Sequence, residues 1–427
     1  MTTPDCGEPA GDSIVAHRPT ETDMRHYYEN FVPFNLLFQW LAHARVPTDD
    51  FTHREFAFEH QNGAYQRYLS FQDAAEFKNK VVRANPTRFE VGAVYSVEPK
   101  NRKTVAKSLM RPLAKELVLD IDLTDYDDVR TCCRGTAICR KCWKFVTLAV
   151  AVVDAALRHD FGVRHRVWVF SGRRGVHCWI SDPRMRALRE NGRRAFVEYL
   201  DVLSGGKKSR AAGPNSGVYG MKKPYHPHVE RSLGLLKTHF VDVVLKEQGT
   251  WDAPDAAAAL ANTIPDLRLR QALLARWRAH PHTTSMDRWL DVGTLYADLA
   301  VASFDLVDWR KETILATLYP RLDVEVTRQP NHLLKAPFCV HPGTGRVCVP
   351  FDPAVRDFDP FADAPSVHGL FAQDELQWRN TGLRPGVELF RAYVSGLLKD
   401  EPRRKRARGS GDEAEAEPDG DEPSLEF

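Results

Sequence analysis

The run from Glu116 to Leu123 constrains the fold more than any other part of this 427-residue chain. Its aliphatic residues at 117, 119, 121 and 123 alternate with Val118, Asp120 and Asp122, which is the two-residue period of a half-buried β-strand. Both aspartates should leave one face of that strand, about 6.6 Å apart, a spacing from which two carboxylates can converge on hard cations. Because aspartate is depleted in strands, this pair needs a compensating partner such as a metal ion. A solvent-facing strand end is the plainer alternative for so short a motif.

The composition is that of a globular protein, with 43% hydrophobic and 27% charged residues. The chain has no run of about 18 apolar residues, and its N-terminus lacks a basic region followed by an apolar stretch. We therefore expect no membrane span, no secretory signal and an intracellular location. The net charge is +2, but residues 409–427 hold eight acidic side chains and no basic one, so the rest of the chain is moderately basic. That charge suits a polyanionic partner such as nucleic acid or a nucleotide.

Four of the eight cysteines cluster within eleven residues, and in a reducing compartment such a cluster favours a metal over disulfides. Four thiolates suffice for a closed tetrahedral zinc site, which leaves no open position for a reactive water. The predicted zinc ion is therefore structural, and the adjacent pair at 132 and 133 requires a compact, kinked loop. The predicted ligands are Cys132, Cys133, Cys139 and Cys142.

A hairpin with a charged tip is predicted over residues 166–180. Two apolar runs, 166–170 and 176–180, flank the sequence Ser-Gly-Arg-Arg-Gly at 171–175. The glycines let backbone amides approach a phosphate, Arg173 and Arg174 can make forked contacts to it, and His177 can add another. A solvated turn accounts for the same residues equally well.

A third group of polar residues runs from Asp323 through Asn331–Lys335 to His341. Its carboxylate could add a metal ligand, and its lysine and two histidines could contact a triphosphate. Taken singly, each of these residues is more often structural.

The length exceeds that of one domain, so we expect a principal domain with a second lobe or a large insertion. A helical pattern starts near Thr20, and Arg54 to about Asp122 has the texture of short strands separated by turns. An Ala-rich helix is expected from Trp143 to His159. Further helices are expected over residues 186–204, 231–246, 255–279, 285–304 and 308–319. Strand-like texture returns at 322–326, which indicates a helical subdomain inserted in an α/β core.

These patterns divide the chain into five parts. They are a flexible leader (1–18), a first part of the core that contains the zinc motif 132–142 (19–190), a helical subdomain (191–310), a second part of the core (311–400) and a disordered tail (401–427). The tail opens with a basic block at 402–408 that favours nuclear import over a merely solvated charge run, and then becomes acidic.

Five ordered blocks together resemble the small, catalytic subunit of eukaryotic DNA primase, in the archaeal and eukaryotic primase family. The blocks are Arg54–Phe58, Leu117–Arg130, the cysteine cluster ending in Trp143, Ser171–Trp179 and Asn331–Phe338. The resemblance covers most of residues 20–400, and it overrides the plainer alternatives given above for each motif. It implies an enzyme that joins ribonucleotides into short RNA primers on a DNA template by two-metal nucleotidyl transfer.

The resemblance also implies roles for individual residues. Two Mg²⁺ or Mn²⁺ ions would be held by Asp120, Asp122 and Asp323, and Glu55, Asp120 and Asp122 would be catalytic. Nucleotide binding would fall on Ser171, Gly172, Arg173, Arg174, Gly175, Val176, His177, His332, Leu333, Leu334, Lys335 and His341. Tyr65 and Arg67 would take part in initiation, and the four clustered cysteines would bind zinc.

The implied fold is a mixed α/β primase catalytic core with an inserted α-helical subdomain and a zinc-binding motif. The implied partners are a large subunit with an iron-sulfur cluster, DNA polymerase alpha, a single-stranded DNA template and ribonucleoside triphosphates, in the nucleus. Two alternatives remain at this point. One is a primase-polymerase that uses deoxynucleotides in repair or bypass, and the other is a non-catalytic zinc module that binds nucleic acid.

Overall fold

The computed structural model describes residues 17–203, 221, 223–373 and 377–401, and its strands form two antiparallel sheets there. Sheet A has the order β2-β1-β3-β4, with β8 also paired to β3, and sheet B has the order β5-β7-β6-β9. The strands of sheet A are β1 (Arg54–Glu59), β2 (Tyr65–Leu69), β3 (Arg88–Tyr95), β4 (Pro112–Ala114) and β8 (Leu334–Lys335). Those of sheet B are β5 (Leu117–Asp122), β6 (Arg166–Phe170), β7 (Gly175–Ile180) and β9 (Pro350–Phe351).

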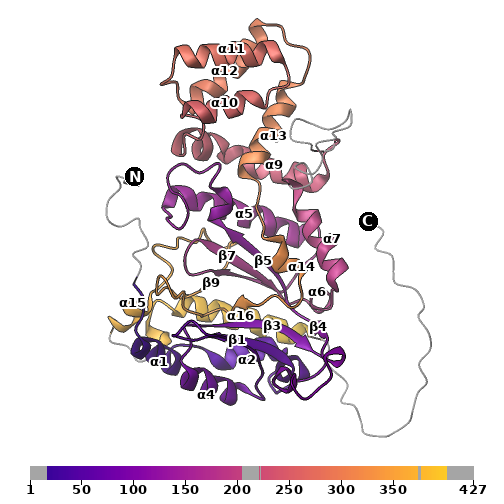
Figure 1. Ribbon diagram of the computed structural model, residues 1–427, viewed down its shortest axis with the longest axis vertical. Helices are drawn as coiled ribbons and strands as arrows, with labels where there is room; N and C mark the ends of the chain where they lie inside the picture. Colours follow the sequence, from indigo (N-terminus) through magenta and orange to yellow (C-terminus); the bar gives the residue numbers. More distant parts are fainter. Residues whose placement is uncertain (1–16, 204–220, 222, 374–376, 402–427) are drawn as a thin grey trace, which may run out of the picture.

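Helices pack around both sheets (Figure 1). Near sheet A lie α1 (Glu21–Asn30), α2 (Phe34–Ala42), α3 (Asp49–Thr52) and α4 (Ala74–Ala84). Near sheet B lie η3 (Leu123–Tyr126), α5 (Arg140–His159), α6 (Pro183–Arg186), α7 (Glu190–Leu200) and α14 (Val324–Arg328). The remaining short turns and C-terminal helices are η1 (Pro99–Asn101), η2 (Lys107–Leu109), α15 (Val367–Phe371), η5 (Trp378–Asn380) and α16 (Arg384–Asp400).

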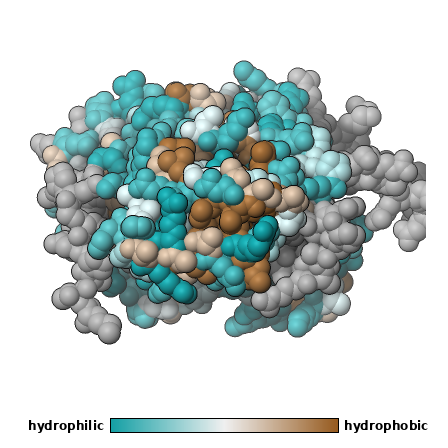
Figure 2. All heavy atoms as spheres, turned by 90° about the horizontal axis from the view of Figure 1, so that it is seen from above, coloured by the Kyte–Doolittle hydropathy of each residue, from teal (hydrophilic) through white to brown (hydrophobic). Residues whose placement is uncertain are grey.

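A group of helices occupies the end of the molecule opposite sheet A (Figure 1). These helices are α9 (Pro227–Phe240), η4 (Val241–Glu247), α10 (Pro254–Asn262), α11 (Leu267–Ala279), α12 (Ser285–Asp298) and α13 (Leu306–Leu318). Their core contains stacked indole rings, with Trp289 between Trp251 and Trp309 at centroid distances of 5.9 and 5.3 Å. Seen from this end, apolar side chains gather near the middle of the face among hydrophilic ones (Figure 2).

Two of the predicted elements position the site. β5 has the predicted alternation, because Leu117, Leu119 and Ile121 are fully buried whereas Asp120 and Asp122 are partly exposed. The predicted hairpin is also confirmed: β6 pairs with β7 around the turn at 171–174. β7 then pairs with β5, so the strand with the aspartates and the hairpin lie side by side in sheet B.

The last helix, α16, packs the C-terminal part of the described chain against its N-terminal part. α16 packs against α2 and sheet B, and the Phe390 ring lies 5.6 Å from the Trp40 ring. The Trp40 indole and the Tyr393 hydroxyl both donate to the Ser181 hydroxyl just beyond β7. These contacts bury the polar ends of both rings with a partner, so the helix fixes the N-terminal layer against sheet B.

Three predicted elements were wrong. The region from Arg54 to about Asp122, where only strands were expected, also contains helix α4. Asp73 caps the start of this helix, because its side chain accepts a hydrogen bond from the Glu76 amide. The single helix expected over 255–279 is two helices, since Pro265 lies between them and lacks an amide donor. The strand-like run at 322–326 is the start of α14, because the Asp323 carboxylate accepts the Glu325 amide and caps a helix there.

Candidate active site

Antiparallel pairing sets Asp120 opposite His177 and Asp122 opposite Gly175. The pairing is close, since a Cβ on Gly175 would lie 2.2 Å from the Ile121 carbonyl oxygen. A residue with a side chain would push β7 away from β5 at this point. Glycine therefore holds the tip of the hairpin against the end of the strand that carries both aspartates.

Asp323 reaches the same place from a part of the chain about 200 residues later. Its backbone N–H donates to the Asp120 carbonyl at 3.1 Å, and its carboxylate caps α14. The next turn of that helix is tied to the same strand, because the Thr327 hydroxyl donates to the Val118 carbonyl at 2.6 Å. The structure thus brings together the three predicted metal ligands.

The carboxylates form an acidic cluster. Burial raises the pKa of Asp120 to about 7, and the charges of Asp122 and Asp323 add to that rise. Burial together with the same two charges also raises the pKa of Asp125, in the turn after β5. The protein neutralises the charges of these carboxylates only in part, and several carboxylate oxygens are the ligands that hard divalent cations prefer. In the part of the chain that the structure describes, only the four cysteines form a ligand group whose atoms all lie within 4.8 Å of one another.

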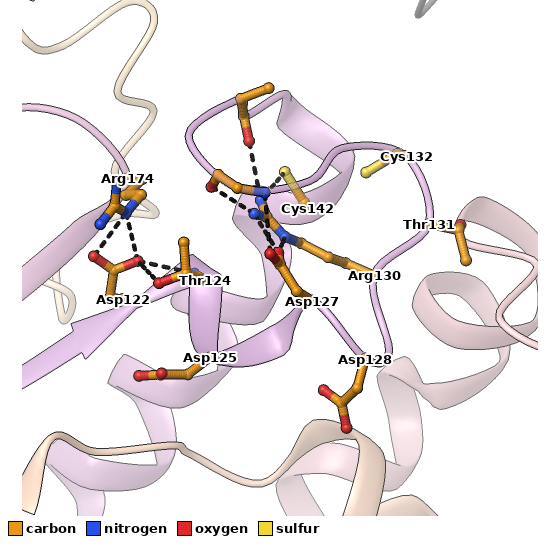
Figure 3. Close-up of polar contacts among 12 residues, drawn as sticks. Asp122, Thr124, Asp125, Asp127, Asp128, Arg130, Thr131, Cys132, Cys142 and Arg174 are labelled. Atoms are coloured by element: carbon orange, nitrogen blue, oxygen red, sulfur yellow. Dashed lines mark hydrogen bonds and ion pairs between the residues drawn. The ribbon is translucent and has the colours of Figure 1, made fainter. Parts of the chain in front are cut away.

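Cationic side chains face this cluster. The Arg174 Nε donates to both oxygens of Asp122 at 2.7 and 2.8 Å (Figure 3). Lys335 donates from Nζ to the Ser171 carbonyl at 2.7 Å, which connects β8 to the tip of the hairpin. Burial lowers the pKa of His341 to about 3, and the nearby charges of Lys335 and Arg173 lower it further. Arg173, Arg174 and Lys335 therefore place cationic groups beside the acidic cluster.

The predicted histidines are neutral parts of this region. Burial and the charge of Lys335 lower the pKa of His177 to about 3. Its Nε2 lies 3.7 Å from an Asp120 oxygen, whereas its buried Nδ1 has no hydrogen-bond partner among the described residues.

Gly172, at the hairpin tip, has a φ of +91°, and a Cβ there would meet the Cβ of His341 at 2.5 Å. This glycine lets the hairpin tip approach the 341–345 turn, where the Thr344 hydroxyl donates to the Gly172 carbonyl.

The remaining nucleotide-binding candidates lie on either side of these contacts. Val176 is buried in β7 and Leu334 in β8, so both act through packing. Leu333 packs over Gly92 of β3, where a Cβ would lie 2.7 Å from it. The His332 ring is partly exposed, while its backbone carbonyl accepts from Lys115 Nζ at 2.5 Å.

Lys115 is a residue that the sequence did not single out. It is 1% exposed, and burial lowers the pKa of its ammonium group to about 7, with the charge of Arg193 acting in the same direction. Lysine before a strand is ordinarily a solvated residue, so nothing in the local pattern pointed to it. Its contact to His332 is 217 positions away in the sequence.

Glu55 belongs to sheet A rather than to the sheet of Asp120 and Asp122, and it is fully buried in β1. Its carboxylate accepts from Arg67 Nε and Nη2 at 2.9 and 3.2 Å, from the Tyr68 amide at 3.2 Å and from the Tyr95 hydroxyl at 3.1 Å. Arg67 also donates to the Asn331 carbonyl at 3.2 Å. Both oxygens of Glu55 are thus engaged by protein groups, and its link to the nucleotide-binding candidates runs through Arg67.

Tyr65 lies on the same exposed sheet edge as Arg67 and is 46% exposed. Its hydroxyl donates to Glu90 of β3, which also forms an ion pair with Arg88 at 3.1 Å. The two predicted initiation residues therefore lie on β2, where the buried Glu55 of β1 holds Arg67 and the buried Glu90 of β3 holds Tyr65.

The four cysteines gather at the start of α5. Cys139 Sγ lies 3.5 Å from Cys132 Sγ and 4.0 Å from Cys142 Sγ, so the sulfurs are close without being bonded. Hydrogen-bond donors face them: the Gln248 amide at Cys132, and the Cys139 N–H and Arg130 at Cys142. Arg130 also pairs with Asp127 in the turn after β5 (Figure 3). Four converging sulfurs with N–H donors fit a structural zinc ion.

The sequence profile described as "DNA primase small subunit" matches residues 119–353, which contain the three aspartates, the cysteines and the hairpin. The DNA primase small subunit of Schizosaccharomyces pombe is 45% identical over 91% of this chain and 85% of its own. This chain belongs to the DNA primase small subunit family. The corresponding subunit of Saccharomyces cerevisiae is 43% identical over 91% of this chain and 95% of its own, and that of Drosophila melanogaster is 40% identical over 78% and 77%.

Membership defines the activity. As the catalytic small subunit of primase, the protein is a nucleotidyltransferase that synthesises RNA primers for replication. A primase small subunit works in complex with a large subunit. Both alternative functions, a primase-polymerase acting in repair and a non-catalytic zinc module, are thereby set aside. The profile begins at Leu119, so it does not reach Glu55, Tyr65 or Arg67.

Proposed function

We propose that Asp120, Asp122 and Asp323 hold two Mg²⁺ or Mn²⁺ ions at which one ribonucleotide is joined to the next. The convergence of these carboxylates from β5 and from the start of α14 carries the proposal. When bound, such ions favour deprotonation of an attacking 3′-hydroxyl and neutralise charge on the transferring phosphoryl group. Asp122 accepts hydrogen bonds from Thr124 and from Arg174, but its side chain is 31% exposed whereas that of Glu55 is fully buried. The Arg174 contact would therefore give way when a cation binds.

The residues around the hairpin tip would bind the incoming ribonucleoside triphosphate. Arg173, Arg174 and Lys335 supply positive charge on the side that faces the acidic cluster. The neutral His177, with one ring nitrogen unpartnered, supplies a hydrogen bond to a phosphate oxygen. Such groups, fixed before the substrate binds, stabilise charge that develops in the transition state without reorganising.

Glu55 takes part by orienting Arg67 rather than by binding a cation. Its two oxygens are occupied by three protein donor groups, and Arg67 holds the Asn331 carbonyl at the start of the nucleotide-binding segment. Tyr65 and Arg67 lie on the exposed side of β2, where a first nucleotide would be received.

The partners follow from this activity. We assign a single-stranded DNA template, ribonucleoside triphosphates, a large subunit with an iron-sulfur cluster and DNA polymerase alpha, with the complex acting in the nucleus. The basic block at 402–408 that would direct import lies outside the described residues. None of the helices described is long and apolar enough to cross a membrane.

The same reasoning supports the division of the chain. A catalytic core is formed by residues 19–190 and 311–400, and a helical subdomain formed by 191–310 is inserted between them. α13 crosses the second boundary, since it runs from Leu306 to Leu318. The leader 1–18 and the tail 401–427 lie almost entirely outside the described residues.

Primer synthesis on a polypyrimidine single strand tests the metal site. We expect short RNA products from the wild-type chain with its large subunit, ribonucleotides and Mg²⁺ or Mn²⁺, and a yield lower by about a thousandfold or more from Asp120→Asn or Asp323→Asn. Asp128→Asn is the matched control, because this aspartate is 65% exposed and pairs with Arg321 outside the cluster. Near-normal synthesis by Asp120→Asn or Asp323→Asn would remove the assignment.

A further inference from the structure

The segment between β3 and β4 has a charge that the active site does not use. Residues 99–111, here called the basic strap, contain five basic side chains and no acidic one. All five are exposed, namely Lys100, Arg102, Lys103, Lys107 and Arg111. Among the described residues, Lys100 forms an ion pair with Glu98, whereas the other four exposed cations form none. Uncompensated like charges repel, so a surface of this kind is relieved by a polyanion.

The strap is anchored to the edge of sheet A that carries the initiation residues. The Lys100 amide donates to the Ser70 hydroxyl, and the Gln72 side chain to Glu98. At the other end, the Ser96 amide donates to the Arg111 carbonyl, which closes the segment into a loop beside β4 (Figure 1). The cations are therefore held on a folded surface.

An aromatic ring connects the strap to the nucleotide-binding segment. The Arg102 guanidinium lies 4.1 Å from the centre of the Tyr68 ring, and that of Arg67 lies 5.1 Å from it. Tyr68 is partly exposed and has a φ of +63°, which is a strained backbone conformation for a tyrosine. Arg67 in turn holds the Asn331 carbonyl. Arg67 and Tyr68 thus connect the strap to the candidate nucleotide-binding segment along β2.

We propose that the basic strap and Tyr68 bind the single-stranded DNA template as it approaches the active site. The strap cations would contact successive phosphates, and Tyr68 would stack on a base, which is the combination that single-strand binding surfaces use. Leu109 and Leu113, which are 58% and 57% exposed beside these cations, offer apolar surface to further bases or sugars. This inference rests on the proposed function, because it takes DNA as the template.

Binding of a labelled polypyrimidine strand over a range of salt concentrations tests the strap. The strap variant is Lys103→Ala/Lys107→Ala/Arg111→Ala in the full chain. We expect its Kd at about 0.1 M salt to rise about tenfold or more, and the slope of log K against log salt to flatten by about 0.7 for each phosphate that the variant no longer neutralises. Tyr68→Leu should weaken binding about tenfold with an unchanged slope, since it removes stacking and no charge.

Two controls separate local from general effects. Lys237→Ala/Arg268→Ala/Arg278→Ala removes three exposed cations from the helical end and should bind the strand like wild type. Lys103→Arg/Lys107→Arg/Arg111→Lys keeps the charge and should do the same. An unchanged Kd and slope in the strap variant would overturn the proposal, as would equally weak binding by the helical control. So would weakened binding of a pre-annealed RNA–DNA duplex with normal binding of the single strand.

Primer synthesis by the same proteins distinguishes failure of the strap from failure of the proposed function. The strap variant should show a raised KM for template and a near-normal kcat at saturating template. If wild type makes primers and the variant has the same template KM, the strap assignment fails while the function stands. If wild type binds the strand through the strap but makes no primers, the function fails while the strap assignment stands.

Discussion

Lys115 shows how a single buried cation can hold the segment that we propose to bind nucleotides. Its ammonium group is 1% exposed and holds the His332 carbonyl, directly before the residues assigned to the triphosphate. Arg67 holds the preceding carbonyl, that of Asn331. Two neighbouring carbonyls are thus fixed by charged donors, and hydrogen bonds of that kind contribute about 1.5–3 kcal/mol each.

A substitution of Lys115 can distinguish a role in positioning the 331–335 segment from a role in the stability of the fold. In Lys115→Met the carbonyl loses a hydrogen bond, but the costly burial of an ammonium group is relieved and the apolar stem still fills the site. The two effects partly cancel, so the free energy of unfolding should fall by less than about 1.5 kcal/mol. We expect the KM for nucleotides to rise about tenfold, with a smaller change in kcat. Steady-state kinetics together with urea denaturation would measure both, and Lys115→Arg should recover part of the affinity. A large loss of stability with normal KM would indicate a purely structural lysine.

Glu116 is the residue whose charge matters most for stability in acid. It is fully buried, its oxygens accept from Arg54 at 2.6 and 3.1 Å, and His43 Nε2 lies 3.0 Å away. Burial alone would raise the pKa of Glu116, but the Arg54 charge and these hydrogen bonds outweigh it and hold that pKa well below the ordinary 4.5. A lowered pKa in the folded state means that the unfolded chain binds the proton more tightly.

The stability provided by Glu116 is therefore fully present above about pH 4.5 and declines as the pH falls below that value. Glu116→Gln should cost about 3–5 kcal/mol near neutral pH, because it leaves the buried Arg54 charge without its partner. The variant should also lose part of the pH dependence between about pH 4.5 and 3. Urea denaturation at several pH values measures both effects. If the free energy of unfolding changed with pH equally in the variant and in the wild type, this role of Glu116 would be contradicted.

At the scale of strands and helices, the pairing of β5 with β7 sets the geometry of the site. Gly175→Ala would place a methyl group 2.2 Å from the Ile121 carbonyl and 3.2 Å from the Asp122 Cα, both of them backbone atoms that cannot turn away. We expect a loss of about 1–3 kcal/mol in stability and a fall in kcat of about tenfold or more, since Arg174 and Asp122 move apart. Thermal melting and primer synthesis would measure these effects. Gly396→Ala, in open space on α16, should leave both unchanged or slightly improved.

Local pattern was enough to predict some elements and not others. β5, the hairpin and α5 each show a periodicity that their own residues impose, and each formed as predicted. α14 was mistaken for a strand because its few residues alternate, and only the cap made by Asp323 distinguishes a short helix from a strand there. The sequence pattern made Asp323 only a weak candidate ligand, and the family resemblance promoted it, since its partner Asp120 is about 200 residues away.

Contacts between distant residues also explain what was missed about the site. The burial of Glu55 and its bonds to Arg67 and Tyr95 depend on how β1, β2 and β3 pair, which no single stretch reveals. The cysteines, by contrast, lie within eleven residues of one another, so their spacing alone predicted the cluster that the structure shows.

Across the whole molecule, the cysteine cluster lies where the catalytic core meets the helical end. The loop before it is bonded to η4 through Thr131 and Gln248, and the Thr250 hydroxyl donates to the Val129 carbonyl at 3.1 Å. Lys144 of α5 pairs with Glu247 in the same region. A zinc ion in the cluster would therefore stiffen the junction between the two parts as well as its own loop.

Removal of zinc should accordingly loosen the junction. We expect Cys139→Ser, or treatment with a strong chelator, to lower Tm by several degrees and to raise hydrogen exchange both in 129–142 and in 241–252. Zinc content by native mass spectrometry should fall from one ion per chain to none. Cys178→Ser, a buried cysteine outside the cluster, should keep its zinc. Normal stability with selective loss of turnover would indicate a catalytic metal instead.

The packing of α16 against α2 has a consequence for biosynthesis. Phe390 contacts Trp40, so a ribosome must translate about 350 further codons before the N-terminal layer meets the helix that covers it. Asp323 and β9 are likewise synthesised late, after the strands that they complete. A nascent chain interrupted before Asp323 has two of the three carboxylates and an uncovered apolar face. Under the metal assignment proposed above, such an unfinished chain would be inactive, and its uncovered apolar face would attract chaperones or proteases until translation is nearly over.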